Sequence, residues 1–200
     1  MKDKFFELKK EKQDRMINAA LQVFARYGYN HASTDEIVKV AGISKGLLFH
    51  YFESKIGLYA FLYDYATRFV TLELARNVDK NENDYFGLYK QILESKADAM
   101  AQYPYIYLFL NKADDEESPE ALREIVERRE KYNRIKDALR ERADITVFPS
   151  NISYSMTWDM LEYTINGLLD KSIKADNFRA DLFLEEAIEY VDMVKQMVLS

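Results

Sequence analysis

Apolar residues recur every three or four positions along most of this chain, which is the spacing of one face of an α-helix. Between residues 10 and 27, for example, Met16, Ala20, Leu21 and Phe24 share a face, and Gly28 ends the pattern. Similar patterns predict about nine helices: the one at 10–27, two short ones on either side of residues 41–44, and six more at 54–78, 84–103, 104–112, 119–143, 151–174 and 180–198. We therefore expect an all-α protein.

The two short helical patterns form the most informative stretch, residues 34–55, which reads TDEIVKVAGISKGLLFHYFESK. Gly42 can adopt the left-handed conformation that ends the first helix, and Ser44 can cap the second. Ala41 is small enough for the two helices to cross closely, and a further helix opens at Ser54. This layout predicts a helix-turn-helix at about residues 33–52, in which the second helix enters the DNA major groove.

The helix-turn-helix pattern also divides its residues between an inner and an outer face. The apolar positions Ile37, Ala41, Ile43, Leu48 and Phe52 can point inward. Outward-facing side chains on the second helix are candidates for contact with base edges, and we expect them at Ser44, Lys45, Leu47 and His50. Gly46 lets the helix approach DNA closely. Thr34 and Lys55, each at a helix start, are the candidate phosphate contacts.

At these residues the chain resembles the TetR family of bacterial transcription regulators. The family pattern is matched at Thr34, Ile37, Ala41, Gly42, Ile43, Ser44, Gly46, Leu48, Tyr51, Phe52, Ser54, Lys55 and Leu58. Val38 and Phe49 depart from it, where the family usually has Ala and Tyr. The family's tyrosine commonly gives a hydroxyl to a phosphate, so Phe49 is expected to make only apolar contact with DNA. The resemblance extends upstream to residues 17–24 and 28–29, and covers about a third of the chain.

The resemblance implies a division of labour along the chain. A DNA-binding domain is expected at 8–70, with the helix that begins at Ser54 as a bridge. An effector-binding and dimerisation domain is expected at 71–200. The implied partners are a palindromic double-stranded DNA operator, a small-molecule effector that releases the protein from it, and a second copy of the chain, joined by a four-helix bundle of the last two helices.

Two features of the helices expected from residue 54 onward suggest where those partners bind. Most of their aromatic residues are expected in the core, but some can line a cavity for an apolar or aromatic effector. Our candidates are Tyr65, Phe69, Tyr103, Tyr107, Trp158 and Tyr163. The last two helices carry apolar residues on more than one face, which predicts burial against a partner. The candidate dimer contacts are Met160, Leu168, Ile188 and Val191.

Charge is divided in the same way as the expected domains. Residues 1–58 contain 10 Lys and Arg against 7 Asp and Glu, a net +3, whereas the remainder contains 18 against 27, a net −9. An acidic protein is a poor general binder of nucleic acid, because attraction to phosphate dominates such binding. A basic head on an acidic body can still approach DNA in one orientation.

The sequence argues against the other large classes of protein. It has no Cys and only two His, so thiolate chemistry is excluded and a metal site is not expected. It lacks a phosphate-binding glycine loop, an HExxH motif and a GxSxG nucleophile, so we expect neither an enzyme nor a cofactor. No run of about 20 apolar residues is present, so we expect a cytoplasmic protein without a membrane span. The alternative function is a helical ligand- or protein-binding module that has lost DNA binding.

Overall fold

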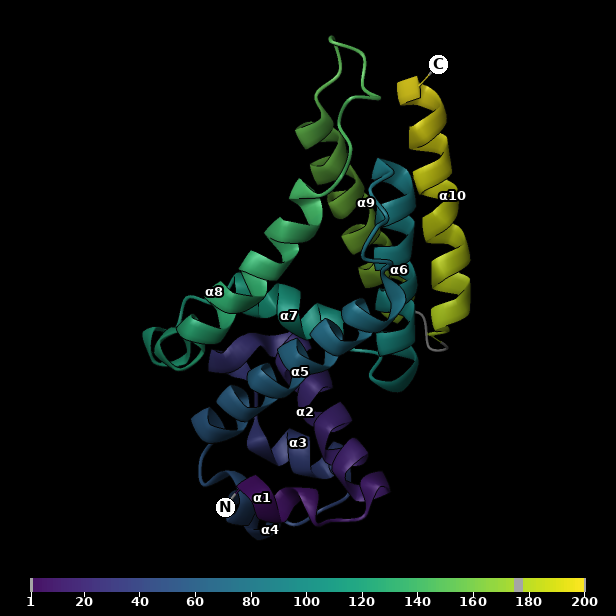
Figure 1. Ribbon diagram of the computed structural model, residues 1–200. Coiled ribbons are helices and arrows are strands. Elements are labelled where there is room, and N and C mark those ends of the chain that lie inside the picture. The colour runs from purple at the N-terminus through teal and green to yellow at the C-terminus, as the bar shows by residue number, and fades with distance from the viewer. Residues whose placement is uncertain (1, 175–177, 200) are drawn as a thin grey trace. The chain divides into compact units, whose positions relative to one another are not determined.

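The computed structural model describes residues 2–174 and 178–199, and helices make up most of this part of the chain (Figure 1). The expected all-α class is confirmed. The described helices are α1 (Lys2–Phe6), α2 (Lys10–His31), α3 (Thr34–Ala41), α4 (Lys45–Phe52), α5 (Lys55–Asn77), α6 (Tyr85–Gln102), α7 (Ile106–Asp114), α8 (Pro119–Glu141), α9 (Tyr154–Lys174) and α10 (Ala180–Leu199). None of them is long and apolar enough to cross a membrane.

The chain divides into two compact units. The first unit comprises Met1–Phe69 and Tyr105–Asn133, and the second comprises Val70–Pro104 and Arg134–Ser200. The division therefore falls within α5 and within α8. The domain boundary expected after residue 70 lies next to the first division. Residues 105–133, which we expected in the effector-binding part, group with the first unit because α7 packs against α2.

In the first unit, α2 is the central helix and packs against both α3 and α7. Its apolar face is buried at Met16, Ile17, Leu21 and Phe24, as the sequence pattern predicts. Gly28 interrupts the helix with φ 65° and ψ −179°, a left-handed φ that side-chain-bearing residues rarely adopt. The backbone then makes one more helical turn to His31, so the expected end at Gly28 is an interruption rather than the last residue.

Helix α1 is the element that the sequence did not predict. The Phe5 ring is fully buried and contacts the rings of Tyr51, Phe52 and Phe61 at centroid distances of 5.8, 5.2 and 5.3 Å. The Gln13 side chain donates to the backbone carbonyls of residues 6 and 8 at 3.0 and 2.7 Å, which fixes the turn between α1 and α2. A five-residue helix shows no period, so tertiary packing rather than pattern decides it.

In the second unit, α10 packs against α6 and α9. Helix α6 begins where the sequence predicts, because the Asp84 side chain accepts a hydrogen bond from the Gly87 N–H at 2.6 Å. The loop after α8 joins the segment before α6 through the Asp144 N–H, which donates to the Asn83 carbonyl at 2.7 Å. Helix α9 begins at Tyr154, three residues later than expected.

Candidate nucleic-acid interface and effector region

The turn between α3 and α4 is set by two residues of the predicted kind. Gly42 follows α3 with φ 64° and ψ 40°, the left-handed conformation that ends a helix. The next N–H, that of Ile43, donates to the Val38 carbonyl at 3.1 Å. Ser44 caps α4, since its hydroxyl oxygen accepts from the Leu47 N–H at 3.2 Å. The hydroxyl of Ser44 is thus already engaged in holding the helix.

The two faces of the helix-turn-helix differ in burial. Ile37, Ala41, Leu48 and Phe52 are buried, and Ile43 is half-buried. On the opposite face, the exposed residues are Ser44, Lys45, Gly46 and His50, whereas Leu47 and Phe49 are half-buried. Thr34, half-buried, is the first residue of α3. The fold thus presents the candidate base contacts on one accessible face of α4.

Both candidate lysines have partners within the chain. The Lys45 ammonium lies 2.8 Å from a carboxylate oxygen of Asp35, and both side chains are well exposed. The Lys55 ammonium donates to the carbonyls of Asn30 and Ala32, at 3.2 and 3.1 Å. An exposed ion pair such as that of Lys45 is weak and exchanges readily with a phosphate. Lys55 instead points toward the junction of α2 and α3.

Two glycines of this region differ in what they do for the fold. A Cβ added at Gly57 would lie 2.2 Å from the Phe52 carbonyl oxygen, so the corner between α4 and α5 requires glycine there. A Cβ added at Gly46 would meet nothing within 4 Å. Glycine within a helix costs about 0.5–1 kcal/mol relative to alanine. Packing of the described residues gives no reason for that cost at Gly46, so the open space above α4 is available to a ligand.

The model for bacterial regulatory proteins of the tetR family matches residues 16–61, which span the buried part of α2, the whole helix-turn-helix and the first turns of α5. The chain carries a TetR-type DNA-binding domain. The match includes Gly42 and Ser44, the residues that set the turn, and the exposed face of α4.

Two curated relatives each match about half of this chain. YuxN of Bacillus subtilis (strain 168), an uncharacterized HTH-type transcriptional regulator, is 35% identical over 94 residues, or 44% of this chain and 32% of the relative. IcaR of Staphylococcus aureus (strain Newman), the negative transcriptional regulator of the biofilm operon icaADBC, is 26% identical over 108 residues, or 52% of this chain and 56% of the relative. The matches thus span about half or less of each relative's length.

Solved structures resemble nearly the whole chain. A TetR family regulator from Chloroflexus aurantiacus J-10-FL has a TM-score of 0.64 with 20% identity, over 98% of this chain and 95% of its own. The fatty acid degradation regulator FadR from Bacillus halodurans has a TM-score of 0.58 with 20% identity, over 89% and 96%. At this level of identity, the likeness shows that the chain shares the overall helical fold of these structures.

The six aromatic residues expected around an effector are divided between the units. Tyr65, Phe69 and Tyr107 belong to the first unit, and Tyr103, Trp158 and Tyr163 to the second. Tyr163 is 78% exposed, so it lies on the surface of the single chain, and its contact with an effector stays a prediction. Helix α9 carries apolar residues on several faces, and spacing alone cannot distinguish the face that turns outward.

Trp158 lies at the centre of an aromatic cluster in the second unit. The rings of Tyr85 and Tyr89, both from α6, meet it edge-on at centroid distances of 5.5 and 5.0 Å. The guanidinium of Arg140, at the end of α8, lies 5.9 Å from the indole ring. Trp158 itself is almost fully buried. The cluster therefore joins α6, α8 and α9 around one side chain.

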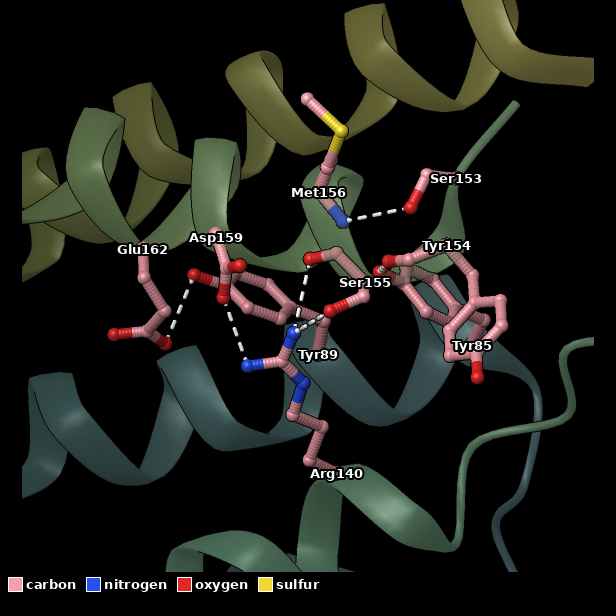
Figure 2. Close-up of polar contacts among 9 residues, drawn as sticks. All are labelled: Tyr85, Tyr89, Arg140, Ser153, Tyr154, Ser155, Met156, Asp159 and Glu162. Carbon is pink, nitrogen blue, oxygen red and sulfur yellow. Dashed lines mark hydrogen bonds and ion pairs between the residues drawn. The ribbon is translucent and has the colours of Figure 1, made fainter. Parts of the chain in front are cut away.

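Polar contacts continue from this cluster along α9 (Figure 2). Arg140 donates to the Asp159 carboxylate at 2.8 Å and to the Ser155 carbonyl and hydroxyl at 2.9 and 2.7 Å. The Tyr89 hydroxyl donates to Glu162 at 3.1 Å. Sequence reasoning missed this network. Its signal in the sequence is a polar stripe at 155, 159 and 162, which is the spacing of one helical face.

Burial raises the pKa values of two tyrosines in this network. It raises the pKa of Tyr89 well above its usual value, and the neighbouring Glu162 carboxylate raises it further. Burial also raises the pKa of Tyr85, whose hydroxyl donates to the Tyr154 carbonyl at 2.6 Å. Both hydroxyls thus act as hydrogen-bond donors at neutral pH. Within the described residues, no group of three or more His, Asp or Glu side chains is arranged to hold a metal ion.

The candidate dimer contacts differ in exposure. Met160 is 46% exposed and Ile188 is half-buried, but Val191 and Leu168 are buried within the single chain. Leu168 and Val191 therefore belong to the core of the protomer, which argues against them as dimer contacts. The large apolar side chains exposed on α9 and α10 are Tyr154, Met156, Met160, Tyr163, Leu182, Met193, Met197 and Leu199.

Proposed function

We propose that this protein is a transcription regulator that binds a palindromic DNA operator as a homodimer and is released from it by a small apolar or aromatic effector. The observation that carries the proposal is the exposed face of α4. The inner side of α4 is packed, and Ser44 caps its first turn. Its outer side exposes Gly46 and His50, and no packing contact within the protein requires a glycine at position 46. A helix held in this way can enter the major groove.

The proposed contacts follow from the chemistry of each exposed residue. His50 and Lys45 can donate hydrogen bonds to base edges, and Leu47 can contact a thymine methyl group. Phe49 lacks a hydroxyl, so it offers only apolar contact to DNA. Thr34, at the start of α3, can donate its hydroxyl to a phosphate. With few polar side chains available, DNA shape should contribute to the choice of operator.

The exposed apolar face of α9 and α10 supports the homodimer. Met156, Met160 and Tyr163 recur on α9 at helical spacing, and Gly167 follows them with nothing within 4 Å of its added Cβ. On α10, Met193 and Met197 are exposed one turn apart. Two copies that join these faces about a two-fold axis would present two α4 helices, which matches a palindromic site.

We place the effector beside the Trp158 cluster in the second unit. Aromatic faces and nearby hydrogen-bonding groups are typical of sites for small organic ligands. The chain contains one tryptophan, so its fluorescence reports on this cluster alone. Repression is proposed by analogy with IcaR, which is described as a negative regulator.

The effector and the operator should oppose each other by the same factor, because the coupling of two binding equilibria is reciprocal. An effector that weakens operator binding 100-fold corresponds to about 2.7 kcal/mol of coupling. Titration of aromatic and fatty-acid compounds against Trp158 fluorescence, with and without operator, measures this factor. Equal affinities in the two titrations would exclude the tested compound as an inducer.

The DNA-binding proposal is tested by selection of duplexes from a random pool with the full-length protein. We expect an enriched palindrome whose half-site centres lie about 34–36 Å apart or at a multiple of that distance. His50→Ala should change the preferred bases. The matched control is His31→Ala, because His31 is the other histidine, is exposed, and lies outside α4. Failure to enrich any duplex would contradict the proposal.

Phe49 favours one alternative, a helical binding module that no longer binds DNA. Its ring replaces the hydroxyl that TetR-like chains commonly offer to phosphate. The same selection separates the two functions, since a module of this kind would enrich no sequence. Phe49→Tyr sharpens the result: a regulator should bind its operator more tightly when the hydroxyl is supplied, whereas a module without DNA affinity should gain no measurable binding from one neutral hydroxyl.

A further inference from the structure

Tyr29 is the meeting point of three segments of the first unit. It follows the interruption at Gly28 and is 6% exposed. Its backbone N–H donates to the Glu116 carboxylate at 3.1 Å, and its hydroxyl donates to the Glu120 carboxylate at 2.7 Å. These partners lie 87 and 91 positions later in the chain, in the connection between α7 and α8 and in the first turn of α8. The end of α2 is therefore tied to that distant segment.

The carboxylates of this connection are held in place locally. The second oxygen of Glu116 accepts from the Ser118 N–H at 2.9 Å, so the side chain is fixed while its other oxygen receives the Tyr29 N–H. Glu120 lies within the first turn of α8, where the helix dipole stabilises a negative charge. Hydrogen bonds to charged acceptors are stronger than those between neutral groups. The two contacts with Tyr29 are accordingly of the stronger kind.

Lys55 reaches the same place from the start of α5. Its ammonium lies 4.7 Å from the centre of the Tyr29 ring, within the range of a cation–π interaction. It also donates to the carbonyls of Asn30 and Ala32. An ammonium has three N–H donors. Two of them can bind these carbonyls while the positive charge contacts the face of the Tyr29 ring. The side chain is thus directed into the protein.

The carbonyls that Lys55 binds belong to the junction between α2 and α3. Carbonyls at the end of a helix lack intrahelical partners and carry partial negative charge, so a cation stabilises them. The next residue, Ser33, is the one from which α3 starts. The position of α3 therefore depends on this junction, and α4 follows α3 after the turn at Gly42.

We infer that Tyr29 and Lys55 are positioning residues that orient the helix-turn-helix, and that Glu116, in the α7–α8 connection, and Glu120, in the first turn of α8, hold Tyr29 in place. The inference rests on the proposed function and deepens it. It assigns Lys55 a role other than the phosphate contact expected from the sequence. It also identifies a segment 60 or more positions beyond the helix-turn-helix that affects operator binding without touching DNA.

The first test is the salt dependence of operator binding by Lys55→Ala. A lysine that neutralises a phosphate contributes about 0.9 per subunit to the slope of log affinity against log salt concentration. A positioning lysine contributes nothing to that slope, so we expect Lys55→Ala to bind about 3- to 10-fold more weakly with an unchanged slope. Lys45→Ala, on the exposed face of α4, serves as the comparison. A slope reduced by about 0.9 per subunit would overturn the positioning role of Lys55.

The second test separates Tyr29 from general damage to the fold. Tyr29→Phe removes one hydroxyl and keeps the ring, and Glu120→Gln removes the matching charge. Each should weaken operator binding about 3- to 10-fold, and the double variant should be no weaker than either single variant. Glu117→Gln, an exposed carboxylate in the same connection, is the control and should leave affinity unchanged. Additive effects of the two changes, or no effect of either, would overturn the inference.

Hydrogen exchange distinguishes this inference from the proposed function itself. In the DNA-free full-length protein, Tyr29→Phe and Lys55→Ala should accelerate amide exchange in residues 30–41, while Glu117→Gln should not. Unchanged exchange in that segment would contradict the structural link whether or not DNA is bound. If the exchange changes as expected but the wild-type protein enriches no duplex, the link stands and the DNA-binding proposal fails.

Discussion

The helix-turn-helix and the second unit are held together by interactions of different range. In the helix-turn-helix and the corner that follows it, Gly42, Ser44 and Gly57 each act on backbone groups within five positions. In the second unit, the Tyr85 hydroxyl reaches a carbonyl 69 positions away, and Lys96 meets Glu162 over 66 positions. Short-range contacts leave a signature in the sequence, whereas long-range contacts depend on how helices pack. The recognisable part of the chain is therefore the part whose geometry is set locally.

The largest effect should come from the local backbone constraint at Gly57. Gly57→Ala places a Cβ against the Phe52 carbonyl, so the corner between α4 and α5 must shift, at a cost of about 2–3 kcal/mol in the free energy of unfolding. Gly46→Ala is the matched control and should not lower that free energy. Urea unfolding of both variants measures the difference. Equal stabilities would show that the corner does not depend on its glycine.

A somewhat smaller effect is expected in the second unit when one carboxylate is removed. Glu162 accepts hydrogen bonds from Tyr89 and Lys96, and the side chain of Lys96 is only 14% exposed. Glu162→Ala should lower the free energy of unfolding by about 2 kcal/mol, because the buried Tyr89 hydroxyl loses this acceptor and the shielded Lys96 ammonium loses this ion pair. Glu94→Ala, an exposed carboxylate on α6, should have little effect. Comparable losses in both variants would contradict the long-range network.

The pH dependence of stability should report on Asp64, which pairs with one arginine near it in the sequence and one far from it. Burial raises the pKa of Asp64, but hydrogen bonds from Arg128 and Arg68 outweigh it and lower the pKa overall. A carboxyl group with a depressed folded-state pKa stabilises the protein at pH values above its unfolded-state pKa of about 3.9. That stabilisation is lost as the pH falls through the folded-state pKa. Asp64→Asn should cost about 1 kcal/mol at pH 7, and less below pH 4.

The two arginines that pair with Asp64 allow a near and a distant partner to be compared. Arg68 is a neighbour four positions along α5, whereas Arg128 comes from α8, 64 positions away, and is less exposed. Arg128→Ala should therefore cost more stability than Arg68→Ala. Urea unfolding at pH 7 and at pH 3.5 tests both the order and the pH dependence. A loss for Asp64→Asn that grows as pH falls would contradict the assigned sign.

The smallest effect on stability is expected at the exposed ion pair of the helix-turn-helix. Asp35→Asn should change the free energy of unfolding by less than about 0.5 kcal/mol, since both partners are in water. It removes a negative charge beside Lys45, so affinity for duplex DNA should rise about 2- to 5-fold, most strongly at low salt. Fluorescence anisotropy measures this. Weaker binding by Asp35→Asn would show that the carboxylate positions Lys45 rather than competing with phosphate.

What the sequence predicted follows the same division between short and long range. Gly42, Ser44 and the inward set from Ile37 to Phe52 were predicted because each depends on neighbours a few positions away. Helix α1 was missed because the burial of Phe5 depends on rings some 50 positions further along. No periodicity in a five-residue segment could indicate that burial.

The burial of residues in the second unit was harder to predict for a related reason. Helices α9 and α10 are apolar on several faces. Such a pattern predicts that more than one face is buried, but it does not tell whether the chain itself or a second copy covers each face. Spacing therefore could not show that Val191 is buried within the single chain, or that Tyr163 is exposed on it. Exposure in the folded chain identifies the outward face, which spacing alone could not.

The central claim is that α4 is built to approach DNA, and Gly46→Ala tests it most directly. The added methyl group meets nothing within 4 Å in the protein, so the free energy of unfolding should stay constant or rise by about 0.5–1 kcal/mol. Operator affinity, measured on the same sample by anisotropy, should fall about tenfold or more because the methyl group occupies the space that DNA must enter. Unchanged stability with unchanged operator affinity would contradict the claim.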